Sequence, residues 1–337
     1  MDEAASETTT SSPPPSLSEA VRVFVRIGDR TVETQDPAEA HRLMAARDVH
    51  GWLDCTDPSP EQVQGIAAKL ELHPLIAEEI IEHNQRAKIA EVDRHLHIVL
   101  FALGFEGEIT ASEVDFVLGE RFLLTVHDAD FDPFRLPQLR EGVDKVLQRG
   151  SDYLLYAIAD GIVDDYFPAL DSLTEEIDQL EDDVVEKANT WTLQRLFTLK
   201  RELMSLRRAT SPAREIFNQL TNRQQRLIAP ENLIYFRDVY DHLIRVTDEV
   251  DNDRELVSGT LDVYLSTVNN NLSLIMKRLT GVTVILAGVG ALAGVFGMSE
   301  ASAALSGTEA MGFWMVTLGI AILGVITAAV LRRIDWL

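Results

Sequence analysis

The sequence predicts an α/β domain followed by a long helical stalk and two transmembrane helices. Strand and helix signals alternate up to about residue 150, as is typical of α/β domains. An apolar pattern at helical spacing then continues from Pro230 into a run of 21 uncharged residues, and a second uncharged run of 22 residues follows near the C-terminus. Each run is close to the ~20 apolar residues that a helix needs to cross a bilayer.

The composition is strongly acidic, with 54 acidic and 30 basic residues and a formal net charge of −24 in a chain of 337 residues. This charge excludes a general nucleic-acid binder, which needs a basic surface. Cys55 is the single cysteine, so no intrachain disulfide can form, which fits a reducing cytosol. Residues 1–19 are polar and acidic and contain no apolar run, so we expect a disordered tail and no signal peptide.

Residues 20–150 are predicted to form a cytosolic α/β domain. A strand is expected at 21–27, where VRVFVRI places every second residue on one apolar face. A helix is expected to start at Pro60, because Ser59 can cap it and a glutamine follows at the third helical position. Further strands and a helix are predicted at 95–103, at 122–127 and after Pro133.

Residues 151–229 are predicted to form long acidic antiparallel helices. Ser151 to Glu186 contains twelve acidic residues and no Lys or Arg, which indicates either a solvated surface or an ion-binding role. The second helix is expected to begin near Trp191 and to be disturbed at Pro212. The apolar residues of the first helix recur at spacings of three and four: Leu155, Ile158, Ile162, Tyr166, Leu170, Leu173, Ile177, Leu180 and Val184.

A single stalk helix is predicted to run from residue 230 into the first membrane span, which ends at residue 299. At 1.5 Å per residue, residues 231–296 would form a helix roughly 100 Å long, and the single Gly259 is tolerable within it. Because one chain cannot cover a seam of that length, the pattern predicts a parallel oligomer around an axis, with the first span nearest the axis. The seam consists of Phe236, Val239, Leu243, Val246, Val250, Val257, Leu261, Tyr264, Val268, Leu272, Ile275 and Leu279.

The flanks of the two spans predict their orientation in the membrane. Lys277 and Arg278 precede the first span, and Arg332 and Arg333 follow the second. The positive-inside rule then places both termini in the cytoplasm. An external loop (300–309), a second transmembrane helix (310–331) and a basic cytosolic tail (332–337) complete the predicted organisation.

Several segments resemble the CorA family of magnesium and divalent-cation transporters, which includes the zinc-linked ZntB branch. YFRDVYDH (235–242), VSGTLDVYLSTVNN (257–270), MKRLT (276–280) and FGM (296–298) are similar to the stalk and first span of that family. SDYLLYAIADGIVDDYF (151–167) is similar to its long acidic helix, and the closing RRIDWL to its basic tail. The resemblance covers roughly residues 50–337 and implies a funnel-shaped homopentamer in the inner membrane, surrounded by lipid, that conducts a divalent cation, with Mg²⁺ the first expectation.

The resemblance also implies a pore mouth at Gly297, Met298 and Ser299, where the family has Gly-Met-Asn. In the family, five Asn carboxamides are thought to accept hydrogen bonds from the water shell of Mg²⁺, which loses that water reluctantly. The Ser299 hydroxyl is a shorter and weaker acceptor, so we expect a wider and less selective mouth.

The register of the resemblance places a stripe of pore-lining residues on one face of the first span. Met276 and Leu279 match the apolar gate, which would close by excluding water. Gly290 and Gly294, or Ala287 and Ala291, are also small-residue pairs that favour close helix packing, and we assign packing to Gly294 and Ala291. The predicted lining is Ser273, Met276, Leu279, Thr283, Ala287 and Gly290.

Asp238 matches a stalk carboxylate that the family uses in a regulatory Mg²⁺ site between subunits, with Asp93 as a candidate partner. The alternative is that Asp238 is a surface residue near Arg237.

His95 and His97 lie on one face of a predicted strand and could supply two zinc ligands, although no third ligand is apparent nearby. We expect no enzyme and no bound cofactor, because the sequence has no phosphate-binding loop and no nucleophilic triad.

Two functions therefore remain open. The first is a divalent-cation channel for Mg²⁺ or for a transition metal such as Zn²⁺, Co²⁺ or Ni²⁺. The second is a related pore that has lost divalent selectivity, either a nonselective or tension-gated channel or a membrane-anchored regulatory scaffold. The choice between these two functions depends on whether a pore mouth with Ser299 can still select divalent cations.

Overall fold

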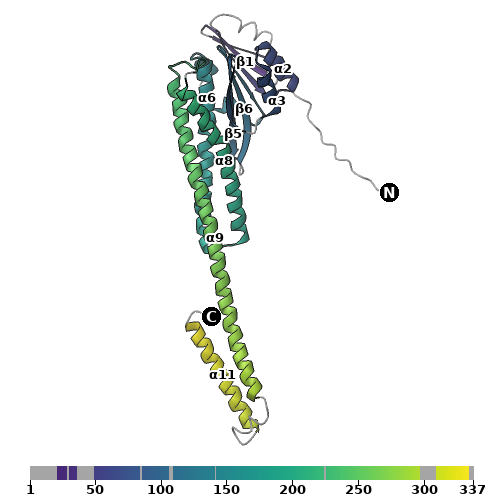
Figure 1. Ribbon diagram of the computed structural model, residues 1–337, viewed down its shortest axis with the longest axis vertical. Helices are drawn as coiled ribbons and strands as arrows, with labels where there is room; N and C mark the ends of the chain where they lie inside the picture. Colours follow the sequence, from purple (N-terminus) through teal and green to yellow (C-terminus); the bar gives the residue numbers. More distant parts are fainter. Residues whose placement is uncertain are drawn as a thin grey trace, which may run out of the picture. The chain divides into compact units, whose positions relative to one another are not determined.

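The computed structural model describes residues 21–28, 30–35, 49–83, 86–105, 109–140, 142–223, 225–296 and 309–333. Figure 1 shows a mixed sheet with helices and a series of long helices. The chain divides into two compact units. The first comprises Met1–Leu180 and Gln194–Ser258, and the second comprises Glu181–Leu193 and Gly259–Leu337.

A seven-stranded sheet organises the first unit, with the strand order β2-β1-β3-β7-β6-β5-β4. β3 and β7 pair in parallel, and every other neighbouring pair is antiparallel. Its strands are β1 (Val21–Ile27), β2 (Arg30–Thr34), β3 (His50–Thr56), β4 (Lys88–Val92), β5 (His95–Phe105), β6 (Ile109–Leu118) and β7 (Phe122–His127). The predicted bounds of the first and last of these strands are confirmed.

Two short helices, α2 (Pro60–Lys69) and α3 (Pro74–Glu82), cover one face of the sheet. The predicted start of α2 is confirmed, since Ser59 caps the helix and Gln62 completes the capping box. Cys55 on β3 is fully buried in the apolar cluster beneath these helices. Burial, reinforced by the charge of Asp54, raises the pKa of its thiol far above the usual value.

The opposite face of the sheet is covered by α6 (Ser151–Asp164), which contacts β3, β5, β6 and β7. Three shorter elements precede it: the 3₁₀ turn η1 (Pro133–Arg135), α4 (Pro137–Arg140) and α5 (Val143–Leu147). On this face Trp52 stacks on Phe24 with ring centroids 5.2 Å apart. The result is a three-layer α/β/α domain, as the alternating signals predicted.

The long acidic helix predicted from Ser151 is interrupted at Asp165, and a separate helix, α7, spans Tyr166–Glu186. Pro168 explains the interruption, because proline has no N–H to donate to the carbonyl of Asp164 and its ring crowds that carbonyl. α8 (Thr190–Asn222) instead continues through Pro212, so the predicted disturbance does not end this helix. All nine apolar residues of the predicted acidic-helix seam are buried.

The predicted stalk is one unbroken helix, α9 (Leu233–Phe296), of 64 residues. It contains a stretch long and apolar enough to span a membrane, and little of that stretch is buried. α11 (Glu309–Arg333) covers the predicted second span. The predicted N-terminal tail, pore mouth, most of the external loop and residues 334–337 lie outside the described residues.

Candidate functional site

The six predicted pore residues all lie on α9, and every one of them is exposed. Met276 and Leu279, the predicted gate, are 56% and 60% exposed. Their exposure is notable because a contiguous row of exposed apolar side chains usually marks a surface that another molecule covers. The structure therefore brings this stripe together on a helix surface that no described part of the chain covers.

Within the second unit, α11 packs on a different face of α9. A Cβ built on Gly324 of α11 would lie 3.7 Å from Cγ2 of Val289. By contrast, a Cβ built on Gly288, Gly290 or Gly294 would meet nothing within 4 Å. Close packing against other described residues does not account for these glycines, so their positions, which lie on more than one side of α9, are open to other subunits or to water.

The two hydroxyls of the stripe are oriented by the helix itself. Ser273 donates to the carbonyl of Asn269 at 2.9 Å, and Thr283 donates to the carbonyl of Leu279 at 2.8 Å. Each hydroxyl therefore uses its one O–H in a bond to its own helix. Its oxygen lone pairs stay available to accept hydrogen bonds from the water around a cation.

A second group of potential cation ligands lies in the first unit, between α6 and α9. Asp160, Asp164 and His242 each offer one atom, and these atoms lie within 4.8 Å of one another. Asp164 Oδ1 is 3.5 Å from His242 Nδ1, and Asp238 Oδ2 is 4.0 Å from His242 Nε2. His242 Nδ1 is buried and makes no hydrogen bond to any described residue. Oxygen and imidazole donors at this spacing fit one divalent cation, with the nitrogen favouring a transition metal.

The electrostatics of this group favour a cation. Burial raises the pKa of Asp160, and the negative charges of Asp164 and Asp238 act in the same direction. Gln138 donates to Asp160 at 2.9 Å and to Asp164 at 3.2 Å, which partly offsets the effect. A bound divalent cation would neutralise these carboxylates more completely than one amide donor can.

Sequence reasoning selected Asp238 but missed its three neighbours. Asp160 and Asp164 are four residues apart on α6, as are Asp238 and His242 on α9, so each pair shares a helix face. This spacing of four residues was the sequence signal that could have revealed both pairs. Asp93, the suggested partner of Asp238, lies instead in the exposed turn between β4 and β5, with a positive φ of 55°, and does not join the group within this chain.

His95 and His97 do not form a shared metal site among the described residues. His97 is fully buried, with Glu79 3.1 Å from one ring nitrogen and Asp115 2.7 Å from the other. His95 packs against the ring of Phe122, and burial lowers its pKa. His97 therefore bridges two carboxylates, whereas His95 packs against an aromatic ring.

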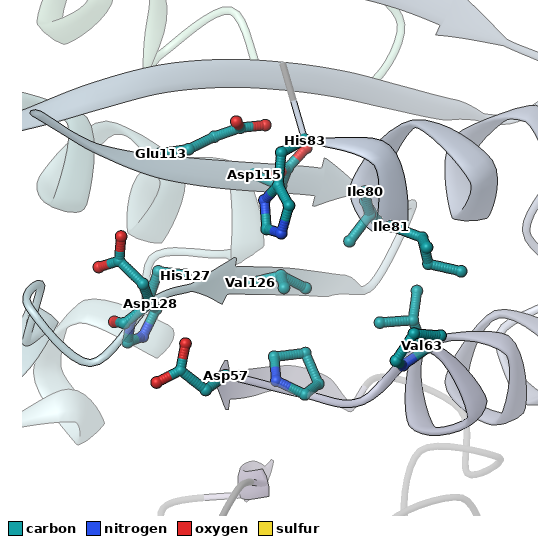
Figure 2. A pocket seen from close by; sticks show the side chains of 12 residues that line it. Asp57, Val63, Ile80, Ile81, His83, Glu113, Asp115, Val126, His127 and Asp128 are labelled. Carbon is teal, nitrogen blue, oxygen red and sulfur yellow. The ribbon is translucent and has the colours of Figure 1, made fainter. Parts of the chain in front are cut away.

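Figure 2 shows a small pocket of about 190 Å³ where carboxylates and histidines meet. Its buried polar groups already have partners within the chain. Asp115 contacts His97, while His127 contacts Asp54 at 3.1 Å and the carbonyl of Asp128 at 2.7 Å. Although burial opposes it, the bond to Asp54 raises the pKa of His127. Because these groups satisfy one another, the pocket is a weaker cation site than the Asp160 group.

Comparisons with known proteins agree on one family. Residues 48–333 match the family described as CorA-like Mg²⁺ transporter protein. A cobalt/magnesium transport protein CorA from Thermotoga maritima is 36% identical over 255 residues, covering 74% of this chain and 72% of that protein. A CorA from Methanocaldococcus jannaschii is 25% identical over 289 residues, covering 85% and 91%.

Solved structures show the same fold. The complete CorA magnesium transporter from Methanocaldococcus jannaschii superposes with a TM-score of 0.79 at 22% identity, covering 94% of this chain and 99% of that one. The full-length CmaX protein superposes with a TM-score of 0.72 at 18% identity, covering 94% and 97%. From the match over most of its length, this chain belongs to the CorA-like Mg²⁺ transporter family.

Proposed function

We propose that this chain is one subunit of a homopentameric divalent-cation channel in the inner membrane, with both termini in the cytoplasm. The observation that carries the proposal is the exposed stripe on α9, which begins at Ser273, continues into the segment able to span a membrane and lies away from the contact with α11. Relatives named as cobalt/magnesium, magnesium and zinc transport proteins support a divalent cation as the substrate.

α9 has a first part in the first unit, Leu233–Ser258, and a second part in the second unit, Gly259–Phe296. In this proposal the second part lines an axial pore. Met276 and Leu279 form an apolar constriction that closes by dewetting. Ser273 and Thr283 present hydroxyl oxygens to the water shell of the ion, which suits Mg²⁺ because it gives up that shell reluctantly. Ala287 and Gly290 leave room nearer the mouth, which is formed by Gly297, Met298 and Ser299.

The Asp160, Asp164, His242 and Asp238 group is the proposed regulatory cation site. It joins α6 to α9, so an ion bound there would hold the stalk helix against the α/β domain through charge-assisted contacts. Asp238 lies beside the other ring nitrogen of His242, Nε2, so in this proposal it orients the imidazole while Nδ1 faces the ion. A contribution from Asp93 would have to come from another subunit.

A second function follows from Ser299. If five hydroxyls cannot order the water shell of Mg²⁺ as five carboxamides do, the same architecture would be a pore with weak divalent selectivity.

The test is ion flux into liposomes containing the purified full-length protein, with Mg²⁺, Co²⁺, Ni²⁺, Zn²⁺ and K⁺ compared side by side. Gly290→Phe should block flux, because the new side chain enters an open face of α9 and meets no described residue of its own chain. Gly319→Phe on α11 is the matched control, since a Cβ there also meets nothing within 4 Å. Equal flux in the two variants would contradict a path along α9.

A further inference from the structure

Four arginines surround one cleft in the first unit, distinct from the cation group. Arg207 and Arg208 lie on α8, Arg254 lies on α9, and Arg86 precedes β4. The cleft has a volume of about 800 Å³, within the range typical of small-molecule sites. Such a concentration of arginine is unexpected in a chain with a net charge of −24.

The positive charge of this cleft is only partly neutralised. No carboxylate of the described part of the chain lines it, and Asp251 beside it accepts from both Arg207 at 2.7 Å and Arg254 at 2.8 Å through the same oxygen. These two guanidiniums hold the pKa of Asp251 below its usual value, chiefly through the bond from Arg207. Among the residues that the structure describes, Arg86 and Arg208 have no carboxylate within 4 Å. Two guanidiniums are therefore free to bind an external anion.

The chemistry of the lining selects the class of anion. Guanidinium groups bind phosphate oxygens through paired, charge-assisted hydrogen bonds, and several around one cleft match an anion with several charges. Ser211 adds a hydroxyl, and Met204 and Pro212 supply apolar surface beside the charges. We propose that this cleft binds a soluble anion that carries two or more phosphates, as a nucleoside triphosphate does.

The test is calorimetric titration of the full-length protein in phospholipid-free detergent, with EDTA present so that chelation of Mg²⁺ cannot contribute. Tripolyphosphate and ATP should bind, and AMP and inorganic phosphate should bind at least about tenfold more weakly, because fewer charges face the arginines. Arg208→Gln and Arg86→Gln together should weaken binding of tripolyphosphate by about tenfold or more.

Arg214→Gln is the matched control, because Arg214 lies on α8 and pairs with Asp248 of α9 at 3.8 Å but does not line the cleft. It should change the affinity for tripolyphosphate by less than about twofold, and equal loss in the control would overturn the proposal.

Absence of tripolyphosphate binding at millimolar concentration, or equal binding of AMP, would also overturn the proposal. If the double variant instead altered only the oligomer mass, the cleft would be a subunit contact and not a phosphate site. Thermal unfolding of each variant confirms that it is folded, and the exposed positions of Arg86 and Arg208 make loss of folding unexpected.

Discussion

The two parts of α9 carry the same apolar repeat in opposite surroundings. In the first part Phe236, Val239 and Leu243 are fully buried, and the ring of Phe236 lies 6.1 Å from that of Phe217 on α8. In the second part Leu272 and Leu279 are 56% and 60% exposed. A periodic pattern thus specifies which side chains share a face, whereas the rest of the chain decides whether that face is covered.

The difference indicates two ways of stabilising one helix. The first part is stabilised within the subunit, by the helices that pack around it. The apolar side chains of the second part from Leu272 to Leu279 have no such cover among the described residues. In the proposed channel, lipid and neighbouring subunits would cover them. The proposed pentamer is therefore expected to depend on residues that contribute little to the folding of one chain.

The largest expected effect tests this contrast directly. Leu243→Ala should destabilise the folded protein by about 2–5 kcal/mol, because it leaves a cavity in a packed core. Leu272→Ala should change stability by only about 0.5 kcal/mol but should lower the pentamer fraction. Thermal unfolding and native mass spectrometry measure the two properties. A stable monomer or dimer as the main species of the wild type would rule out the proposed assembly.

Polar substitution at the gate should have the next largest effect. Met276→Asn or Leu279→Asn should raise the basal ion leak about tenfold or more, because a polar ring keeps the constriction wet. Leu274→Asn is the control, since Leu274 is also exposed but lies about 160° around the helix from Met276. Liposome flux without a gating stimulus is the measurement. Identical leak in wild type and gate variants would mean that these side chains only pack.

A smaller effect, on ion selectivity, is expected when Ser299 at the predicted pore mouth is replaced. Ser299→Asn restores a carboxamide to each of five subunits, so selectivity for Mg²⁺ over K⁺ should rise by more than the ~1 kcal/mol of a single hydrogen bond. The measurement is the ratio of Mg²⁺ to K⁺ and Zn²⁺ flux in wild type and variant. A strong Mg²⁺ preference in the wild type, or an unchanged ratio in the variant, would place selection elsewhere in the pore.

The smallest effect concerns the Asp160 group. The pKa of Asp160 is raised in the folded state, so the folded protein binds this proton more tightly and loses stability as pH rises from about 3.9 through the raised pKa. Asp160→Asn should therefore not reduce the unfolding temperature at pH 7 in EDTA. It should remove much of the stabilisation by Mg²⁺ or Ni²⁺, which is only about 0.4 kcal/mol for a ligand at a concentration equal to its Kd.

Asp165→Asn is the control for this prediction. Burial raises the pKa of Asp165 as well, but Asp165 does not belong to the cation group. Its substitution should leave stabilisation by divalent cations unchanged. If Asp160→Asn kept the full cation-induced shift in unfolding temperature, Asp160 would not be a cation ligand and the group would not be the cation site.

Much of the fold followed from local signals in the sequence. The strand at Val21, the capped helix after Ser59 and the unbroken α9 were all predicted, because each depends on residues close together in the chain. The break at Asp165 was missed because the proline that causes it lies three residues further along.

The candidate cation group was harder to predict. Its ligands come from α6 and α9, about eighty residues apart, and only the packing of those helices brings them together. Sequence spacing showed which residues share a helix face but not which two faces meet. The members of the proposed pore stripe could be predicted from the sequence because they all lie on one helix. The ion that such a pore would select depends in this proposal on a symmetric arrangement of several copies, which one sequence does not specify.

The burial of Cys55 has a practical consequence for studying this protein. Its thiol is inaccessible and its pKa is raised, so it should be inert toward maleimides and other thiol-directed reagents under native conditions. Since it is the only cysteine, the wild-type chain already provides a silent background for labelling. A cysteine introduced at Leu272 or Leu279 would then carry a single spin label or fluorophore, and distances between identical positions could report how the subunits of the proposed channel rearrange.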